Sequence, residues 1–171
     1  MKSKLYIFSC LLFLFLSFGI SRAEEKNSIL FVFLIPSEKI NMSVQSVKMF
    51  DSSDKEIATF YPADISASSK NCNFFEAPEG GRWGNITEIE GVKCRNINEK
   101  NSQLQYSFFL IKLSEPVKDD MYFVVKYFDS AENELIPVGF IQGAEFIRLG
   151  QIYRSGTNKW VEDIFEIPVK K

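Results

Sequence analysis

The sequence contains no histidine, and this absence excludes several common kinds of active site. Serine and cysteine triads take their general base from histidine, and most catalytic zinc sites use it as a ligand. We therefore expect no enzyme, no cofactor and no metal site. The one catalytic alternative is a histidine-free glycan hydrolase, which would need only a pair of carboxylates. Its candidates are Glu76, Glu79, Glu88 and Glu90, whose spacing fits ordinary exposed acids better.

Acidic residues are absent from the first 23 positions, which read as a targeting segment. Two lysines precede the apolar run Leu5–Ile20, and Ser21-Arg22-Ala23 places small residues at the −3 and −1 positions of a cleavage point. This pattern predicts a secretory signal peptide over residues 1–23 that is cut after Ala23. The alternative is an uncleaved membrane anchor, because the run approaches the length of a membrane span.

Cysteine is scarce, with three residues in the chain. Loss of the signal peptide removes Cys10 and leaves Cys72 and Cys94 in an oxidising compartment, which favours one disulfide over two free thiols. Closing this loop would stabilise the fold by about 3 kcal/mol according to the chain-entropy model. A structural zinc site is excluded, because two cysteines without histidine do not supply four ligands.

The chain also lacks an excess of positive charge. Removing Lys2, Lys4 and Arg22 with the signal peptide leaves 17 basic residues against 22 acidic ones, a net charge of −5. A mildly acidic surface argues against nucleic acid or anionic lipid as a partner. We therefore expect a protein partner and no stable membrane anchor after cleavage.

No segment has a sustained apolar period of 3.6 residues, so we expect a nearly all-β protein. The continuous apolar run Ser28–Pro36 predicts a central strand buried on both faces. Two hairpins are expected, one from Val44–Phe50 and Ile57–Tyr61 and one from Leu104–Leu113 and Met121–Phe128. Within Leu104–Leu113 the apolar residues change from one face of the expected strand to the other, which indicates a bulge or burial of both faces. Further strands are expected at Ile86–Cys94, Leu135–Ile141 and Trp160–Val169, whereas Phe146–Tyr153 is ambiguous.

An internal repeat links the two halves of the mature chain. The segment Val47–Ile57 lies 78 residues before Val125–Leu135, and six of the eleven positions are identical. Weaker matches flank it, and they align Trp83 with Trp160, the only two tryptophans. Chance similarity between two strand–turn–strand units is the alternative. Halves at about 28–94 and 105–171 are too small for separate cores, so residues 24–171 are expected to form one immunoglobulin-like, two-sheet β-sandwich, pseudo-symmetric through duplication.

The loop from Phe74 to Trp83 is the best candidate for a functional surface in the sequence. The loop follows Cys72 closely in the chain and contains two glycines together with Phe74, Phe75, Arg82 and Trp83. Aromatic residues and arginine anchor many protein interfaces, and binding residues are common on loops. The alternative is that these aromatic residues plug an open end of the sandwich.

Together these features predict an exported, non-catalytic protein-binding or assembly-accessory module of the bacterial cell envelope, in the periplasm or outside the cell. A second hypothesis is a secreted effector or inhibitor that acts on host or competitor proteins. Asn41 and Asn85 also begin triplets that match the N-glycosylation acceptor pattern, which matters only in a eukaryotic source.

Overall fold

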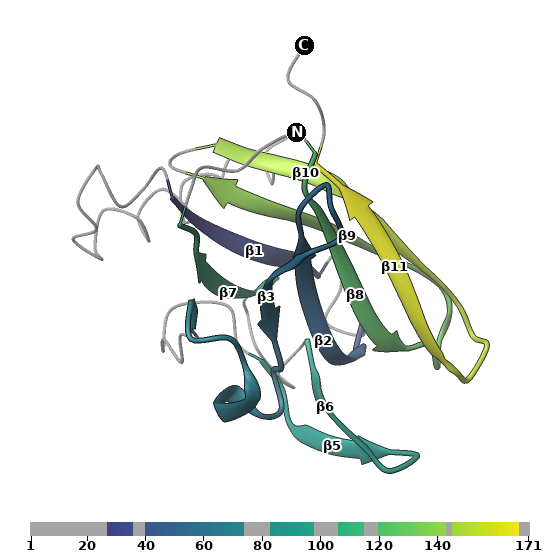
Figure 1. Cartoon of the computed structure of the whole chain (residues 1–171). Coiled ribbons are helices and arrows are strands. Elements are labelled where there is room, and N and C mark those ends of the chain that lie inside the picture. Colours follow the sequence, from purple (N-terminus) through teal and green to yellow (C-terminus); the bar gives the residue numbers. More distant parts are fainter. Residues whose placement is uncertain are drawn as a thin grey trace.

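The structure is a computed structural model that describes residues 27–35, 40–73, 83–97, 106–114, 120–142 and 145–167 (Figure 1). The predicted signal peptide, residues 1–23, lies outside these residues. The described part of the chain is nearly all β, with eleven strands and one short 3-10 helix, η1 (Ile65–Ala67). It includes no helix that is long and apolar enough to cross a membrane.

The strands form two antiparallel sheets that pack face to face. The five-stranded sheet contains, in spatial order, β10 (Glu145–Ser155), β9 (Glu132–Gln142), β1 (Ser28–Leu34), β7 (Tyr106–Lys112) and β4 (Cys72–Asn73). The six-stranded sheet contains β11 (Trp160–Glu166), β8 (Tyr122–Phe128), β2 (Ser43–Phe50), β6 (Val92–Asn96) and β5 (Ile86–Ile89), and β3 (Glu56–Phe60) pairs with β2. The expected two-sheet β-sandwich is therefore confirmed.

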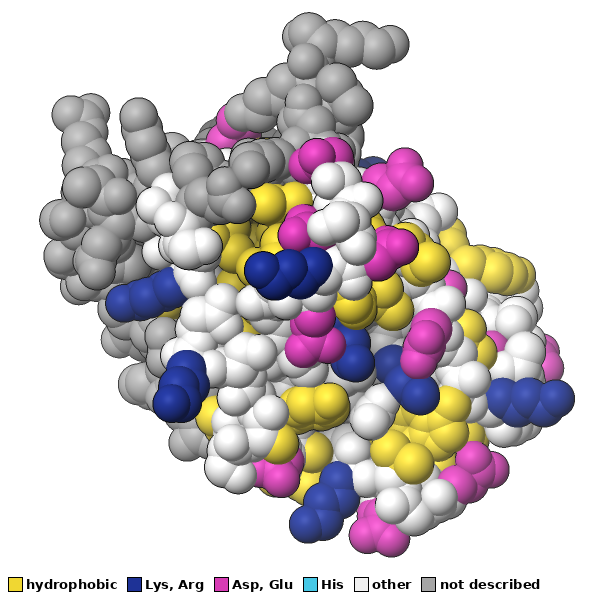
Figure 2. Space-filling model, in the orientation of Figure 1, with side chains coloured by type: hydrophobic (Ala, Val, Ile, Leu, Met, Phe, Trp, Pro, Cys, Tyr) yellow, Lys and Arg dark blue, Asp and Glu magenta, His cyan; other side chains and the backbone are white. Residues whose placement is uncertain are grey.

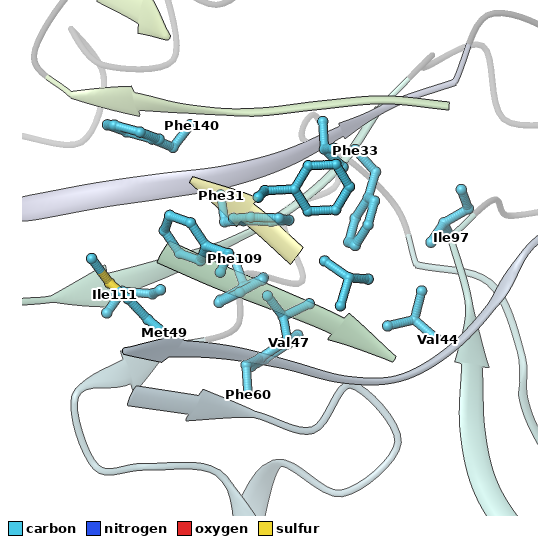
Figure 3. Packing of buried hydrophobic residues seen from close by; sticks show 14 of the residues in the cluster. Phe31, Phe33, Val44, Val47, Met49, Phe60, Ile97, Phe109, Ile111 and Phe140 are labelled. Carbon is cyan, nitrogen blue, oxygen red and sulfur yellow. The ribbon is translucent and has the colours of Figure 1, made fainter. Parts of the chain in front are cut away.

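The main core lies between the sheets and is rich in phenylalanine. Phe31 of β1 lies at the centre, with its ring 5.5 Å from Phe109 of β7 and 4.9 Å from Phe123 of β8. Side chains of β2, among them Val47 and Met49, point toward the rings of Phe31 and Phe109 from the opposite sheet (Figure 3). Aromatic pairs at such distances add to the stabilisation that comes from area burial alone.

A second apolar cluster lies on the other face of the five-stranded sheet. It contains Leu30 and Val32 of β1 together with Phe108 and Leu110 of β7. Both faces of β1 and β7 are therefore buried, as the continuous run Ser28–Pro36 predicts for a central strand. Burial of both faces also explains the phase flip in β7, whose register with β1 contains no bulge.

Two predictions about strand pairing are wrong. The segments Leu104–Leu113 and Met121–Phe128 do not form a hairpin, because β7 belongs to the five-stranded sheet and β8 to the six-stranded sheet. The segment Ile86–Cys94 is not one strand but part of the β5–β6 hairpin. Its turn residues, Glu90 and Gly91, have φ values of 52° and 78°, which a tight two-residue turn requires.

The structure does not confirm the internal duplication. Related strands are antiparallel neighbours, with β1 beside β7 and β2 beside β8. The repeated segments diverge after their turns, however, because β3 pairs with β2 in one sheet whereas β9 leaves β8 for the other sheet. Trp83 lies in the main core, whereas Trp160 is half-buried at the start of β11, where its ring packs against Phe128.

Candidate binding surface

The six-stranded sheet carries a groove on the face that points away from the core. Strand registers place three rows of side chains across β2, β8 and β11: Ser46–Lys126–Glu162, Lys48–Val124–Ile164 and Phe50–Tyr122–Glu166. The groove has a volume of about 480 Å³. Its lining residues are Gln45, Ser46, Lys48, Phe50, Tyr61, Tyr122, Val124, Lys126, Glu162 and Ile164. We call this surface the outer-face groove.

Two stacked aromatic rings form one end of the outer-face groove. The rings of Phe50 and Tyr122 lie 5.2 Å apart at an angle of 15°. The Tyr122 hydroxyl donates a hydrogen bond to Asp54 Oδ1 at 2.8 Å, and this bond raises the pKa of Tyr122. Asp54 lies in the β2–β3 turn with a φ of 60°. The contact therefore ties this turn to β8 and holds the aromatic pair in place.

The two lysines of the outer-face groove are each paired with an acid. Lys48 Nζ lies 3.4 Å from Glu56 Oε2, and Lys126 Nζ lies 3.2 Å from Glu162 Oε1. Exposed pairs of this kind stabilise a fold little. Their effect here is that the groove has no strong field of one sign. On β11, Ile164 leaves 65% of its surface exposed.

The outer-face groove therefore mixes exposed apolar groups with charged groups that are already paired. On the face shown in Figure 2, hydrophobic side chains are separated by Lys, Arg, Asp and Glu and do not merge into one patch. Such a surface has the composition of a protein interface, in which aromatic and aliphatic groups lie within a polar rim.

The predicted partner-binding loop is only partly described. Phe74, Phe75 and Arg82 lie outside the described residues. Trp83 is only 4% exposed, and its ring lies 5.8 Å from those of Phe33 and Phe60. Its indole N–H donates to the carbonyl oxygen of Phe108 at 2.9 Å. This position favours the alternative interpretation, in which Trp83 plugs the core.

The two cysteines do not form the predicted disulfide, because both are free and buried. Their sulfur atoms lie in different surroundings. Cys72 belongs to the main core, whereas Cys94 Sγ donates to the Thr87 carbonyl at 3.5 Å on the neighbouring strand. Burial raises the pKa of the Cys72 thiol to about 12 and also raises that of Cys94. Both thiols are therefore protonated and poorly reactive near neutral pH.

The acids considered for catalysis do not come together in the described residues. Glu88 is exposed on β5 and Glu90 is exposed in the β5–β6 turn, whereas Glu76 and Glu79 lie outside the described residues. Within the described ranges, no group of three or more acids or cysteines could hold a metal ion. Asp51 accepts hydrogen bonds from Ser53 and Lys55 of its own turn. Its carboxylate therefore serves the turn.

A buried arginine joins the connections at one end of β10. Arg154 is fully buried, and its Nη1 donates to Glu134 Oε2 at 2.6 Å and to the Asn41 carbonyl at 3.1 Å. Its Nη2 donates to Ser130 Oγ at 2.9 Å. The Nε atom lies 3.9 Å from Asp129 Oδ1. These contacts tie β10 to β9, to the connection between β8 and β9, and to Asn41.

Asp129, which is 2% exposed, organises the connection between β10 and β11. Its carboxylate accepts hydrogen bonds from the backbone N–H groups of Ser155, Gly156 and Thr157 at 3.2, 3.2 and 3.0 Å. Burial by itself would raise the pKa of Asp129, but the bonds from Thr157, Gly156 and Ser155 lower it overall. The ionised carboxylate thus holds this loop as part of the fold.

The outer-face groove was missed by reasoning from the sequence, although one signal of it is present. In Met121–Phe128, the face opposite the core side also carries three apolar residues, Tyr122, Val124 and Phe128. An exposed strand face with so many apolar groups is typical of an interaction surface. Comparison of the chain with known protein families, with curated proteins and with solved structures finds no match.

Proposed function

We propose that the protein is an exported, non-catalytic binding module of the bacterial cell envelope that contacts a partner protein through its outer-face groove. One observation carries the proposal: Ile164, 65% exposed, lies one row from the stacked Phe50–Tyr122 pair on a surface bordered by paired charges. Exposed apolar groups within a polar rim are the usual anatomy of an interface between proteins. Aromatic anchors contribute most of the binding energy in such interfaces.

Two finer statements belong to this proposal. Export rests on the signal-like residues 1–23, and it predicts a mature chain that begins at Glu24. The sandwich is proposed to be immunoglobulin-like and to have arisen by duplication. The antiparallel adjacency of β1 with β7 and of β2 with β8 supports a two-fold relation between the halves, although the unlike positions of Trp83 and Trp160 do not.

Site-specific photocrosslinking tests the proposed binding surface. Phe50 is replaced by the photoreactive analogue p-benzoylphenylalanine, which conserves an aromatic ring in the outer-face groove. Tyr153 is the matched control, because it is an aromatic residue 56% exposed on β10 of the other sheet. We expect a discrete crosslinked protein from position 50 and none from position 153, with loss of the product in Lys126→Glu.

Equal crosslinking from both positions, or none from position 50, would contradict the proposal. Fractionation of the cells tests the location at the same time. Recovery in the periplasm or on the cell surface agrees with an envelope module. Recovery mainly in the culture medium would instead favour the secreted effector or inhibitor, with the same surface as its binding site.

A further inference from the structure

Strand β11 forms an edge of the six-stranded sheet, and among the described strands only β8 pairs with it. The Ile167 N–H donates to the Met121 carbonyl at 3.1 Å, and the Asp129 N–H donates to the Lys159 carbonyl at 3.0 Å. Both bonds belong to the register of β11 with β8. In an antiparallel pair, residues that bond across alternate with residues whose backbone groups point away.

This alternation identifies the backbone groups at the free edge. Because the backbone groups of residues 159 and 167 bond to the β8 side, those of residues 161, 163 and 165 also point toward β8. The N–H and C=O groups of Glu162, Ile164 and Glu166 therefore point away from β8, toward solvent. Their side chains lie on the outer face, in the three rows described above.

The other edges of the two sheets are protected against further pairing. Strand β10 has register shifts at Arg148/Gly150 and Arg154/Ser155. The edge of β3 is bonded by Ser68 and Ser69, whose hydroxyls accept from the N–H groups of Tyr61 and Thr59 at 2.8 Å. Strands β4 and β5 have only two and four residues.

Strand β11, by contrast, runs for seven residues in unbroken register with β8. Bulges, short strands and covering loops are three devices by which proteins prevent edge-to-edge association, and charged side chains on the edge strand, including inward-pointing ones, are another. Among the described strands, β11 combines length with regularity and has none of the first three devices, and the charges that it carries, on Glu162, Asp163 and Glu166, are all acidic. Its edge is thus suited to accept another strand.

We propose that the β11 edge binds an extended, basic segment of a partner protein by strand addition. This inference rests on the proposed function, because it names how a partner would bind beside the outer-face groove. An added strand places its side chains about 5 Å from those of the edge strand. Lysine or arginine beside Glu166, and beside Glu162 in addition to its partner Lys126, would complement these acids, and an apolar residue would complement Ile164.

Asp163 adds a further requirement for positive charge. It faces the inside of the sandwich between Val161 and Phe165, and it accepts a hydrogen bond from the Tyr127 hydroxyl at 3.1 Å. Burial raises the pKa of Asp163, which is half-buried at the edge. An added strand would cover this carboxylate further, so a cation on that strand would have to compensate for the lost water.

The same acids disfavour a second copy of β11 as the occupant. Self-pairing would bring Glu162, Asp163 and Glu166 close to the three identical acids of the other copy. Like charges opposite one another destabilise a strand pair, whereas opposite charges stabilise it. The acids of β11 therefore favour pairing with a basic strand over pairing with a second copy of β11.

Amide hydrogen exchange tests strand addition directly. The probe is a blocked nine-residue peptide of lysine, valine and threonine, added to the ¹⁵N-labelled protein, in which lysines are placed to lie opposite Glu162, Asp163 and Glu166 and a valine to lie opposite Ile164. We expect exchange at Glu162, Ile164 and Glu166 to slow at least tenfold, while Val161, Asp163 and Phe165 are already slow in the free protein. A control peptide with glutamate in place of every lysine should bind at least tenfold more weakly.

Two variants separate the backbone of Ile164 from its side chain. Ile164→Pro removes an outward N–H without removing a bond to β8, and proline is tolerated at such edge positions. Ile164→Thr keeps the N–H and removes the apolar group. We expect at least a tenfold loss of peptide binding in the first variant and a loss of threefold or less in the second. If Ile164→Pro does not fold, the wild-type protein alone decides whether a strand is added, through slower exchange at the outward amides of Glu162, Ile164 and Glu166 when the peptide is bound.

Three results would overturn the inference: no binding of the lysine peptide, binding without slower exchange at the three outward amides, or binding that Ile164→Pro leaves unchanged. Protection of these amides in the free protein together with a dimer in sedimentation would show that a second copy occupies the edge. A partner that crosslinks from position 50 while the outward amides stay unprotected would leave the proposed function intact and remove strand addition alone.

Discussion

The segments Val47–Ile57 and Val125–Leu135 share six of eleven residues, yet they fold differently after the turn. In the first, Asp51 accepts hydrogen bonds within its own turn, and β3 returns beside β2. In the second, Asp129 is buried and bonds the β10–β11 connection, and β9 crosses to the other sheet. The same aspartate–serine pair thus makes a local turn in one place and a long-range contact in the other.

The neighbouring strand explains the difference. The edge of β8 that would receive a returning strand is occupied by β11 over its whole length. Beside β2, only Ser43 and Val44 are paired with β6, which leaves Val47–Phe50 free for β3. Local similarity therefore sets the turn residues, whereas competition for an edge sets the sheet to which the next strand belongs.

The largest expected effect comes from comparing the two tryptophans. Trp83→Ala should lower the free energy of unfolding by about 3–5 kcal/mol, because it leaves a cavity in the core and removes the indole hydrogen bond to the Phe108 carbonyl. Trp160→Ala should cost about 1–2 kcal/mol, since its half-buried ring contacts mainly Phe128. Urea unfolding followed by far-ultraviolet circular dichroism measures both. Equal losses would mean that the two residues are equivalent, as a preserved duplication requires.

Substitution of the two turn aspartates should likewise cost more stability at the buried Asp129 than at Asp51 in its exposed turn. Asp129→Ala should cost about 3 kcal/mol, because it leaves three backbone N–H groups without their acceptor and removes one of the two acids beside the buried Arg154 guanidinium. Asp51→Ala should cost clearly less, since water can replace the carboxylate in its exposed turn. The measurement is the urea midpoint at pH 7, with Ser52→Ala as an exposed control in the same turn. A larger loss at Asp51 would contradict the structural comparison.

Much of the fold follows from patterns that are visible in the chain. The continuous run Ser28–Pro36 predicts a doubly buried central strand, and the hairpin of β2 and β3 follows from alternation around a polar turn. Sheet membership of β7 and β8 does not follow, because it depends on which distant strands occupy their edges. For Trp83 the sequence leaves an interface and a core position open, because the backbone carbonyl that holds its indole lies 25 residues away.

The candidate site was predicted less well than the fold. An aromatic loop such as Phe74–Trp83 has the composition of an interface, but composition does not tell an exposed ring from a buried one. The exposure of Ile164 arises from the position of β11 at a sheet edge, which only the strand order reveals. The absence of the predicted disulfide likewise depends on the strand order, which places Cys72 in the five-stranded sheet and Cys94 in the six-stranded sheet.

The smallest expected effect is a pH dependence of opposite sign at two acids that both lie near Tyr127. The pKa of Asp129 is lowered in the folded protein from its ordinary value of 3.8. Its contribution to stability is present above pH 3.8 and is lost as the pH falls through the lowered value.

Asp163 is the second acid. The 78-residue offset of the repeat aligns it with Asn85, so the first half of the chain has no acid at the matching position. Burial raises the pKa of Asp163 above 3.8, so its ionisation opposes folding as the pH rises through that window.

Asp163→Asn should therefore stabilise the protein at pH 7, by roughly 0.5 kcal/mol, because water partly screens the half-exposed side chain. The asparagine keeps an oxygen that can accept the Tyr127 hydrogen bond, so the substitution removes the charge and little else. The gain should vanish below pH 3.8, where the native carboxyl is already neutral. Asp129→Asn should do the reverse and lose stability mainly above that pH. Urea midpoints between pH 3 and pH 8 measure both variants, and a loss of stability in Asp163→Asn at pH 7 would show that the Asp163 carboxylate supports the fold.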